Sequence, residues 1–433
     1  MCLIRMINIY MGGQVVSICL YFQVHQPFRM NKYRIFDVGQ HTRYFDEEKN
    51  KQLCKSIAKR CYIPANNLLL KAIEETDGKF RVAFSISGVA LEQFEKYAPE
   101  VIESFRKLAK TGCVEFMAET YYHSLASLFS ENEFEEQVKM HHKKMKDLFL
   151  ADPKVFRNTE LIYNDDVASF AKTQGYDAVL SEGADHILGW RTPNVLYSSH
   201  DIGLALLLKN YQFSDDIAFR FSERSWDQWP LTTEKFVNWI KSIHDDSEIV
   251  NLFMDYETLG EHQREETGIF DFFSELPKAI LTNDSFDFKT PSEIAKEYEP
   301  KDALSVKKHT SWADEERDTS AWLGNKMQVN ALTELYKLEE AIKSANDTAS
   351  LDDWRLLTTS DHFYYMSTKA FGDGAVHSYF NPYDTPYESF ISFMNIMNDL
   401  IYRLKQKNIN VENIKKEVQA LEKDVTTVSG NDR

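Results

Sequence analysis

Up to about Pro291, short runs of β-branched and aromatic residues alternate with longer stretches of helical periodicity. Continuous apolar runs of this kind are typical of strands buried in a parallel sheet. The predicted strands are Val15–Gln23, Phe80–Ser87, Val114–Met117, Val155–Asn158, Tyr176–Leu180, Ile217–Phe221 and Ile249–Asp255. The predicted helices between them are Lys51–Glu75, Leu91–Lys110, Glu131–Phe149, Asp165–Thr173 and Thr233–Ile243. The alternation predicts an α/β fold with a parallel sheet, either a closed barrel or an open doubly wound sheet.

The pattern changes after Pro291, where no strand pattern is evident and helical periodicity takes over. Helices are predicted at Gln328–Ser344, Tyr387–Lys407 and Val411–Val425. Apolar residues in the last two segments recur at steps of three and four, which predicts an antiparallel helical hairpin. We therefore expect an N-terminal extension (1–14), an α/β domain (15–300), a C-terminal helical domain (301–425) and a frayed tail (426–433).

Composition and charge narrow the class of protein. Hydrophobic residues make up 43% of the 433 residues and aromatic residues 13%, which is enough for a large core. Acidic residues outnumber basic ones by 67 to 50, for a formal net charge of -17. A negative field of this size repels phosphate backbones and anionic lipids, so we expect neither nucleic acid nor a membrane surface as a partner. The oligomeric state is not predicted by these features.

The cysteines and the N-terminus indicate the cellular environment. The five cysteines contain no C-x-x-C pair, which argues against both a disulfide framework and a cysteine-based zinc site. No apolar run approaches the roughly 20 residues that a membrane-spanning helix needs. Met1–Tyr10 lacks the apolar core and cleavage site of a signal peptide, and Met11 is an alternative start. We expect a soluble, reduced, cytoplasmic protein.

Carboxylates and one imidazole lie at the ends of four predicted strands. These residues are His25, Glu115, Glu160, Asp255 and Glu257. The carboxyl ends of barrel strands meet at one rim, so we expect these side chains to gather there. A single carboxylate after a strand often caps the next helix, but four strand ends together favour a shared site. Asp255 and Glu257 are two apart in an extended segment and would both point inward, where crowding keeps one carboxyl protonated.

Paired carboxylates indicate glycoside chemistry, in which one group attacks or stabilises the sugar and the other protonates the departing oxygen. Such sites also need apolar platforms for the sugar rings, although large aromatic residues more often fill cores. Aromatic residues in predicted loops are Trp190, Trp226, Trp229, Trp312, Trp322, Tyr121, Tyr122, Tyr364 and Tyr365.

Five ordered segments of the chain resemble those of glycoside hydrolase family 57, and within it the α-amylase-like group. The segments are Val24-His25-Gln26-Pro27, Gly112-Cys113-Val114-Glu115, Asn158-Thr159-Glu160-Leu161, Met254-Asp255-Tyr256-Glu257 and Ser360-Asp361-His362-Phe363-Tyr364. Gly189-Trp190-Arg191 is similar to the amylase-like members as well. The resemblance extends from His25 to beyond Trp354, and five segments in order are a specific signal.

The resemblance implies an incomplete seven-stranded (β/α) barrel as the catalytic domain, followed by a C-terminal helical domain. It also implies a retaining double displacement, with Glu160 as nucleophile and Asp255 as general acid/base. The implied substrate-binding residues are His25, Glu115, Trp190, Glu257, Asp361 and Tyr364. Tyr364 stands where many members carry Trp, and Tyr256 stands where many carry Gly.

The implied activity is cleavage of α-1,4 bonds in starch, glycogen or maltodextrin, without a cofactor or metal. The same residues would make a 4-α-glucanotransferase if a glucan hydroxyl replaced water; we favour hydrolysis because the local resemblances are to the amylase-like group. A metal-dependent polysaccharide deacetylase is a remote alternative, because the 12 histidines form no H-x-x-x-H pair. Asp215-Asp216 with His200 stays open as its site. A non-catalytic glucan-binding protein is disfavoured because both Glu160 and Asp255 are present.

Overall fold

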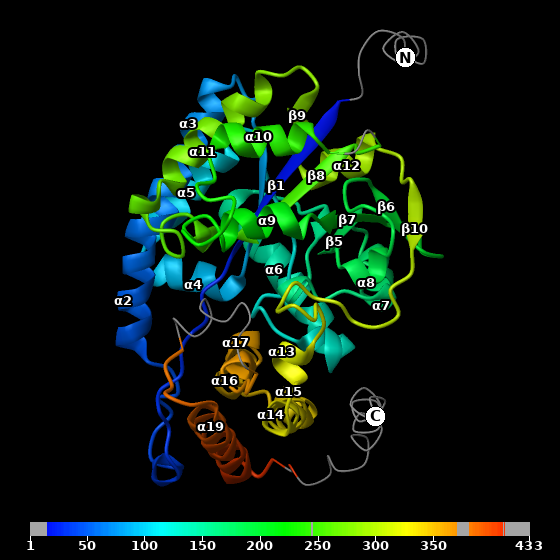
Figure 1. Ribbon diagram of the computed structural model, residues 1–433. Coiled ribbons are helices and arrows are strands. Elements are labelled where there is room, and N and C mark those ends of the chain that lie inside the picture. The colour runs from blue at the N-terminus through cyan, green and yellow to red at the C-terminus, as the bar shows by residue number, and fades with distance from the viewer. Residues whose placement is uncertain (1–14, 244–245, 370–380, 410, 412–433) are drawn as a thin grey trace. The chain divides into compact units, whose positions relative to one another are not determined.

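The computed structural model describes residues 15–243, 246–369, 381–409 and 411 (Figure 1). The predicted N-terminal extension and tail, and the predicted helix beyond Val411, lie outside the described residues. The described chain forms two compact units. Unit 1 comprises the described residues of Met1–Gln26, Lys51–Thr120 and Val138–Trp312, and unit 2 comprises those of Pro27–Asn50, Tyr121–Gln137 and Ala313–Arg433.

Two five-stranded sheets form the centre of unit 1. The first has the order β3 (Val114–Phe116), β2 (Val82–Ile86), β1 (Val16–Val24), β8 (Ile249–Asp255), with β9 (Phe286–Phe288) also paired to β1. The second has the order β10 (Asp302–Leu304), β6 (Tyr197–Ser199), β7 (Ala205–Lys209), β5 (Ala178–Glu182), β4 (Val155–Phe156). The β6–β7 pair is antiparallel and the other pairs are parallel. The predicted α/β class with a parallel sheet is confirmed.

Backbone contacts link the two sheets to each other. Ala118, just after β3, forms a parallel bridge with Phe156 of β4. Asn210, just after β7, donates its N–H to the carbonyl of Asn251 in β8 at 2.9 Å. The strands therefore continue around one core, and the side chains of alternate positions converge inside it.

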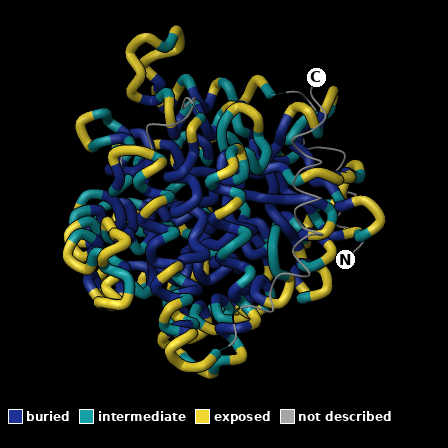
Figure 2. Tube along the Cα trace, turned by 90° about the horizontal axis from the view of Figure 1, so that it is seen from below, coloured by how far each residue is buried: buried dark blue, intermediate teal, exposed yellow. Residues whose placement is uncertain are grey.

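The shared core is apolar. Cys19, Tyr21, Leu180 and Phe253 belong to one buried cluster, which Ile294 of α12 (Pro291–Glu297) also joins. The sequences of the strands are nearly continuous apolar runs, so both faces of each strand can be buried. Removing apolar surface from water stabilises the fold by about 25 cal/mol per Å². Figure 2 shows the result along the chain, with exposed residues concentrated in loops and turns.

Unit 1 has helices at each of the five predicted positions, and further helices, such as Ile269–Leu281, that were not predicted. The helices of unit 1 are α2 (Glu47–Ile57), η2 (Ala58–Tyr62), α3 (Ile63–Glu75), α4 (Gly88–Tyr97), α5 (Pro99–Ala109), α6 (Glu131–Phe149), η4 (Thr159–Leu161), α7 (Asp165–Thr173), α8 (Asp185–Leu188), α9 (Tyr211–Ala218), α10 (Thr233–Lys241), η5 (Tyr256–Thr258), η6 (Glu265–Thr267), α11 (Ile269–Leu281) and α12. Two of them carry residues of both units, since α2 and α6 each begin in a segment of unit 2. The predicted helix Leu91–Lys110 is divided at Ala98, because Pro99 has no N–H to continue it.

Two predictions about strands are wrong. The predicted strand Ile217–Phe221 overlaps α9, which begins where the Asn210 side chain accepts the backbone N–H of Phe213. Phe213 and Ile217 are four residues apart, which places them on one helix face. The region after Pro291 does contain a strand, β10, whose three residues are too short to give a periodic signal.

Unit 2 is helical in its described residues. Its elements are η1 (Ile35–Asp37), η3 (Ala126–Leu128), α13 (Ser320–Leu323), α14 (Lys326–Lys337), α15 (Glu339–Ser344), α16 (Thr348–Leu357), α17 (Ser360–Tyr364) and α19 (Pro386–Gln406), together with the first residues of α2 and α6. The sequence places the domain boundary after residue 300, whereas the compact units divide after Trp312 and two earlier segments belong to unit 2. Periodicity reports local structure and does not indicate which unit a loop packs in.

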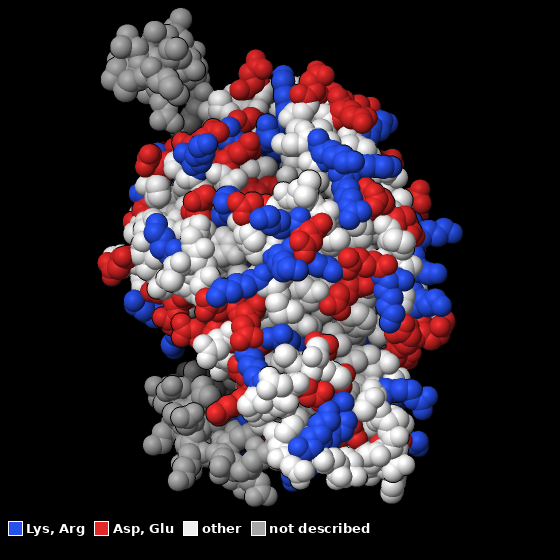
Figure 3. All heavy atoms as spheres, turned by 180° about the vertical axis from the view of Figure 1, so that it is seen from behind, with Lys and Arg blue, Asp and Glu red and all other residues white. Residues whose placement is uncertain are grey.

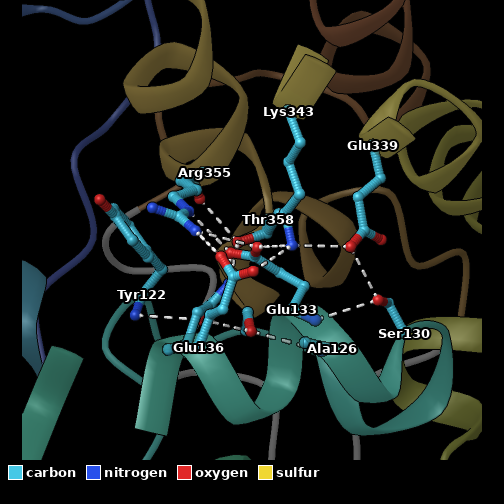
Figure 4. A network of polar contacts seen from close by, with 11 residues as sticks. Tyr122, Ala126, Ser130, Glu133, Glu136, Glu339, Lys343, Arg355 and Thr358 are labelled. Carbon is cyan, nitrogen blue, oxygen red and sulfur yellow. Dashed lines mark hydrogen bonds and ion pairs between the residues drawn. The ribbon is translucent and has the colours of Figure 1, made fainter. Parts of the chain in front are cut away.

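A buried ion network holds part of unit 2 together (Figure 4). Glu133 of α6 has a fully buried side chain, and its Oε1 accepts a hydrogen bond from Nε of Arg355 in α16 at 2.8 Å. Lys343 of α15 reaches Oε2 of Glu133 at 2.7 Å and Glu339 at 2.9 Å. A buried carboxylate needs such counter-charges, because an unpaired ion in the interior is costly.

Two further features are the distribution of surface charge and the character of the helices. On the face shown in Figure 3, acidic and basic side chains are interspersed rather than gathered by sign. Within the described residues, no helix combines the length and the apolar character needed to cross a bilayer.

Candidate active site

Polar residues occupy the carboxyl ends of the parallel strands of unit 1. Gln23 of β1 is in register with Asp255, the last residue of β8. Glu182 of β5 is in register with Lys209, the last residue of β7. Glu160 follows β4 by four residues. Because parallel strands end on the same side of their sheet, these groups belong to one end of unit 1.

Glu160 lies in a strained turn. Its backbone has φ 56° and ψ 25°, the left-handed region that a residue with a Cβ rarely adopts. The turn is held by the Asn158 side chain, which donates to the carbonyl of Ile162 at 2.9 Å, and by a 2.7 Å contact between the hydroxyls of Thr159 and Thr120. Strain that the surroundings hold in place is concentrated at functional sites, because it orients a side chain.

Trp312 fixes the Glu160 carboxylate. Its indole N–H donates to Oε2 of Glu160 at 2.7 Å, and its backbone N–H donates to the carbonyl of Glu160 at 3.2 Å. The guanidinium of Arg157 lies 4.8 Å and the ammonium of Lys209 lies 5.4 Å from the centroid of the same indole. Trp312 therefore contacts Glu160 through its N–H and two cations through its ring. Trp312 was one of several candidate platforms in the sequence, but no local pattern predicted this hydrogen bond.

Lys209 is the centre of a buried ion cluster at the ends of β5 and β7. Its side chain is nearly fully buried, with Nζ 2.9 Å from Oδ1 of Asp215 and 3.5 Å from Oε2 of Glu182. Asp216 pairs instead with Arg220, at 2.6 Å. His200 contacts Asp201.

A metal site at Asp215, Asp216 and His200, left open by the sequence, is not assembled. Across the described part of the chain, no group of three or more His, Cys, Asp or Glu side chains has an arrangement that could hold a metal ion. Asp215 and Asp216 contact different cations, so their neighbouring positions in sequence do not place their carboxylates on a common ligand.

Asp255 and Glu257 have different environments. Asp255 ends β8 in extended conformation and is half-buried, whereas Glu257 is 3% exposed and lies in η5. Oε1 of Glu257 accepts a hydrogen bond from the Tyr62 hydroxyl at 2.5 Å and from Nε2 of Gln26 at 3.2 Å. Burial, followed by the charge of Asp255, raises the pKa of Glu257 to about 8. The expectation that both residues share one inward face is wrong, because the chain turns into a 3-10 helix directly after Asp255.

His25 and Ser87 connect the ends of β1 and β2. Nδ1 of His25 lies 2.7 Å from the Ser87 hydroxyl oxygen. Ser87 is also the N-cap of α4, where its hydroxyl oxygen accepts the backbone N–H of Ala90 at 3.3 Å. The imidazole is therefore held at the rim while remaining partly exposed.

The structure does not bring Glu115 to the rim. Glu115 is in the middle of β3, paired with Ala83, which is itself level with Tyr21. That level is two residues short of the one at which Asp255 lies. Oε2 of Glu115 accepts the backbone N–H of Ser292 at 2.9 Å, so the carboxylate caps the start of α12. This corrects the sequence-based placement of Glu115 with the other candidates.

Glu119 is the carboxylate that sequence reasoning missed. It is fully buried, and its Oε1 accepts hydrogen bonds from the Ser85 hydroxyl at 2.5 Å and from Nε2 of Gln23 at 3.1 Å. Its charge, like those of Asp255 and Arg157, acts on the Tyr21 phenol. Glu119 comes after β3 ends at Phe116, as rim residues do, and that position in the sequence could have identified it.

The remaining candidates are placed as follows. Trp190 lies after α8 and is 93% exposed. Asp361 and Tyr364 belong to α17 of unit 2, and both are buried there. The Tyr364 ring packs against Trp322, with centroids 6.3 Å apart. Roles for these three residues in substrate binding stay predictions.

Comparisons with known proteins identify relatives across most of the chain. A sequence profile described as "Glycosyl hydrolase family 57" matches residues 19–307. A protein of Methanocaldococcus jannaschii named "Putative alpha-amylase" is 44% identical over 401 residues, which cover 89% of this chain and 84% of that protein.

Solved structures share the fold at low sequence identity. The GH57-type branching enzyme from Pyrococcus horikoshii has a TM-score of 0.63 at 13% identity, covering 94% of both chains. The alpha-amylase AmyC from Thermotoga maritima has a TM-score of 0.61 at 13% identity, covering 94% of this chain and 96% of the other. The 4-alpha-glucanotransferase from Thermococcus litoralis has a TM-score of 0.56 at 16% identity; the match covers 82% of this chain and half (50%) of that enzyme.

The profile spans well over half of the chain, and the archaeal relative is similar along nearly all of it. On this evidence the chain is an enzyme that belongs to glycosyl hydrolase family 57.

Proposed function

We propose that the enzyme is a retaining α-glucan hydrolase of the α-amylase type, with Glu160 as nucleophile and Asp255 as general acid/base. The observation that carries this proposal is the Glu160 carboxylate, which is held in a strained turn and bound at Oε2 by the Trp312 indole. The name of the Methanocaldococcus jannaschii relative supports the substrate class. We also propose that β1, β2, β3, β4, β5, β7 and β8 form an incomplete barrel in a protein that acts in the cytoplasm.

In the first step, a Glu160 oxygen attacks the anomeric carbon while Asp255 gives its proton to the glycosidic oxygen. The bond from carbon to the leaving oxygen breaks, and a covalent glucosyl ester forms. In the second step, Asp255 takes a proton from water, whose oxygen attacks the same carbon and releases Glu160. Trp312 keeps the carboxylate plane fixed during both steps, which lowers the entropic part of the barrier.

The first test is a time course with maltoheptaose in the presence of EDTA, with product lengths followed by chromatography. Products only shorter than the substrate support hydrolysis, whereas a mixture of longer and shorter products identifies a 4-α-glucanotransferase that uses the same residues. No reaction by the wild-type protein contradicts both.

The assignment of residues is tested separately. Glu160→Gln and Asp255→Asn should each lower kcat by at least about 10³-fold, since each removes a group that reacts. NMR of the fresh product should show the α-anomer, because two displacements retain configuration. A β-anomer, or near-normal activity in either variant, would contradict the mechanism.

A further inference from the structure

The long helix from Glu47 to Glu75 contains one turn of π-helix, η2, between α2 and α3. Pro64 explains this turn. In a regular α-helix its ring would clash with the carbonyl of Arg60, four residues earlier, and proline has no N–H to donate to that carbonyl. A π-turn is energetically poorer than α-helix and occurs mostly at functional sites. The turn contains Arg60, Cys61 and Tyr62, of which the last two are buried.

These three residues contact the segment that follows Asp255. Nε and Nη2 of Arg60 donate to Oε2 of Glu261, at 2.9 and 2.5 Å, and the Glu261 side chain is fully buried. The Cys61 thiol donates to the carbonyl of Tyr256 at 3.3 Å. The Tyr62 hydroxyl donates to Oε1 of Glu257 at 2.5 Å.

Backbone contact completes the fit between the π-turn and this segment. A Cβ added at Gly260 would lie 2.2 Å from the carbonyl oxygen of Arg60, so only glycine allows the approach. The Arg60 carbonyl, which receives no hydrogen bond from Pro64, is therefore the one against which Gly260 packs. The Tyr256 hydroxyl also donates to Oδ1 of Asn66 in α3, at 2.6 Å. The contacts hold residues 256–261 against the helix.

Glu257 extends these contacts to the segment that carries His25. Nε2 of Gln26 donates to the same Oε1 of Glu257, and the carbonyl of Gln26 accepts Nε2 of Gln93 at 2.6 Å. One buried carboxyl oxygen thus joins three segments: the π-turn, the turn after Asp255 and the turn that follows β1.

We propose that Arg60, Tyr62, Glu257 and Gln26 form a clamp that positions Asp255 relative to His25, so that Glu257 acts as a positioning residue. This inference rests on the proposed function, because it assigns the clamp to the general acid/base. The clamp orients Asp255 through Tyr256, the one residue that separates it from Glu257. A misplacement of about 1 Å at an acid/base is enough to cost a large factor in rate.

The protonation state of Glu257 decides whether it acts by charge or by position. Burial, followed by the charge of Asp255, raises the pKa of Glu257 to about 8, so its carboxyl group is mostly neutral at pH 7. A neutral Glu257 adds no negative charge beside Asp255, and the clamp therefore acts through its hydrogen bonds.

The test compares Tyr62→Phe with the matched control Tyr298→Phe in the full-length protein. The Tyr298 hydroxyl, like that of Tyr62, contacts a side chain on another segment: the Ser17 hydroxyl, at 2.7 Å. Ser17 lies near the start of β1, whereas Asp255 is level with its far end. We expect Tyr62→Phe to lower kcat on maltoheptaose about tenfold with KM within twofold, since it removes a hydrogen bond and no sugar contact. Tyr298→Phe should keep the wild-type values.

Two further variants separate positioning from folding. Arg60→Gln should lower kcat as Tyr62→Phe does, because it removes the hydrogen bonds that hold Glu261 against the π-turn. Glu257→Ala should lower kcat at least as much as Tyr62→Phe, because it removes the acceptor that Tyr62 and Gln26 share. Circular dichroism and thermal melting identify any variant that does not fold.

Wild-type kcat in the folded variants would overturn the clamp, as would equal losses in Tyr62→Phe and Tyr298→Phe. A rise in KM at constant kcat would instead make these residues part of the sugar site. A wild-type protein without activity on glucans would overturn the proposed function and this inference with it. An active wild type with unaffected clamp variants would overturn the inference alone.

Discussion

The indole N–H of Trp312 donates a 2.7 Å hydrogen bond to Oε2 of Glu160, a residue 152 positions earlier in the chain. The two residues share a second, backbone hydrogen bond at 3.2 Å. Trp312 is thus the donor that fixes the carboxylate we assign as the nucleophile, whatever surface its ring offers to a sugar.

Replacing Trp312 with Phe keeps an aromatic ring and removes the donor. A hydrogen bond to a charged group contributes about 1.5–3 kcal/mol, so we expect kcat/KM to fall about 10- to 100-fold. Steady-state kinetics on maltoheptaose measure this loss.

Trp239→Phe is the matched control for this change. Trp239 packs among aromatic residues of unit 1, with its ring 6.0 Å from that of Trp226. Its replacement removes an indole of the same size without touching Glu160. A similar loss of activity in both variants would mean that Trp312 acts only through packing.

Replacing Arg157 should affect stability and activity differently. Its side chain is fully buried, and within the described residues its three guanidinium nitrogens have no hydrogen-bond partner. The group lies 4.8 Å from the Trp312 ring centroid. A buried charge without hydrogen bonds is destabilising, and apolar replacements of buried ions are often neutral or stabilising by about 1–4 kcal/mol.

We therefore expect Arg157→Met to raise or preserve the free energy of unfolding while it lowers kcat/KM at least tenfold. The loss of activity follows from removing a positive charge beside the indole that binds Glu160. Urea unfolding and kinetics on the same preparations test the pair of effects. A variant that loses stability and keeps its activity would show that Arg157 serves the fold alone.

The sequence predicted the α/β class because long buried strands and capped helices carry strong local signals. Val16–Val24 and Ile249–Asp255 were found to within one residue, and Glu131–Phe149 and Asp165–Thr173 to the residue. The strand predicted at Ile217–Phe221 failed because five apolar-rich residues do not distinguish strand from helix, and the Asn210 cap decided the outcome. The short strands β6, β9 and β10 have three residues each and depend on their neighbours.

The candidate site shows the same limit. Glu160 and Asp255 were identifiable because each follows a clear strand, and the motifs around them resemble a known family. Glu115 was placed at the rim although it lies inside the predicted strand Val114–Met117, whereas Glu119, which follows that strand, was missed. The hydrogen bond between Trp312 and Glu160 joins distant segments, and no local pattern encodes it.

Glu257 should make stability depend on pH. Its pKa is raised from the ordinary 4.5 to about 8 in the folded protein, chiefly by burial. Between these values the folded state binds more protons than the unfolded state, so stability falls as pH rises from about 4.5 to 8 and is unaffected by this group outside that window. Each unit of the shift corresponds to about 1.4 kcal/mol.

Glu257→Gln removes this titration, since an amide does not ionise. We expect its free energy of unfolding, relative to wild type, to become steadily more favourable between pH 5 and pH 8. Urea unfolding at pH 5, 6.5 and 8 measures the difference. If the free energies of unfolding of wild type and Glu257→Gln changed in parallel between pH 5 and pH 8, the raised pKa of Glu257 would be contradicted.

The buried ion network of unit 2 gives the sharpest prediction on stability. Glu133 is fully buried and contacts Arg355 at 2.8 Å and Lys343 at 2.7 Å, whereas the neighbouring Glu136 contacts the same two cations with a side chain that is 49% exposed. Removing one partner of a buried pair leaves an uncompensated charge, so Glu133→Ala should cost about 3–5 kcal/mol. Glu136→Ala breaks pairs that water screens and should cost less than about 1 kcal/mol. Urea unfolding of both variants tests this order, and equal losses would mean that burial does not govern the strength of the network.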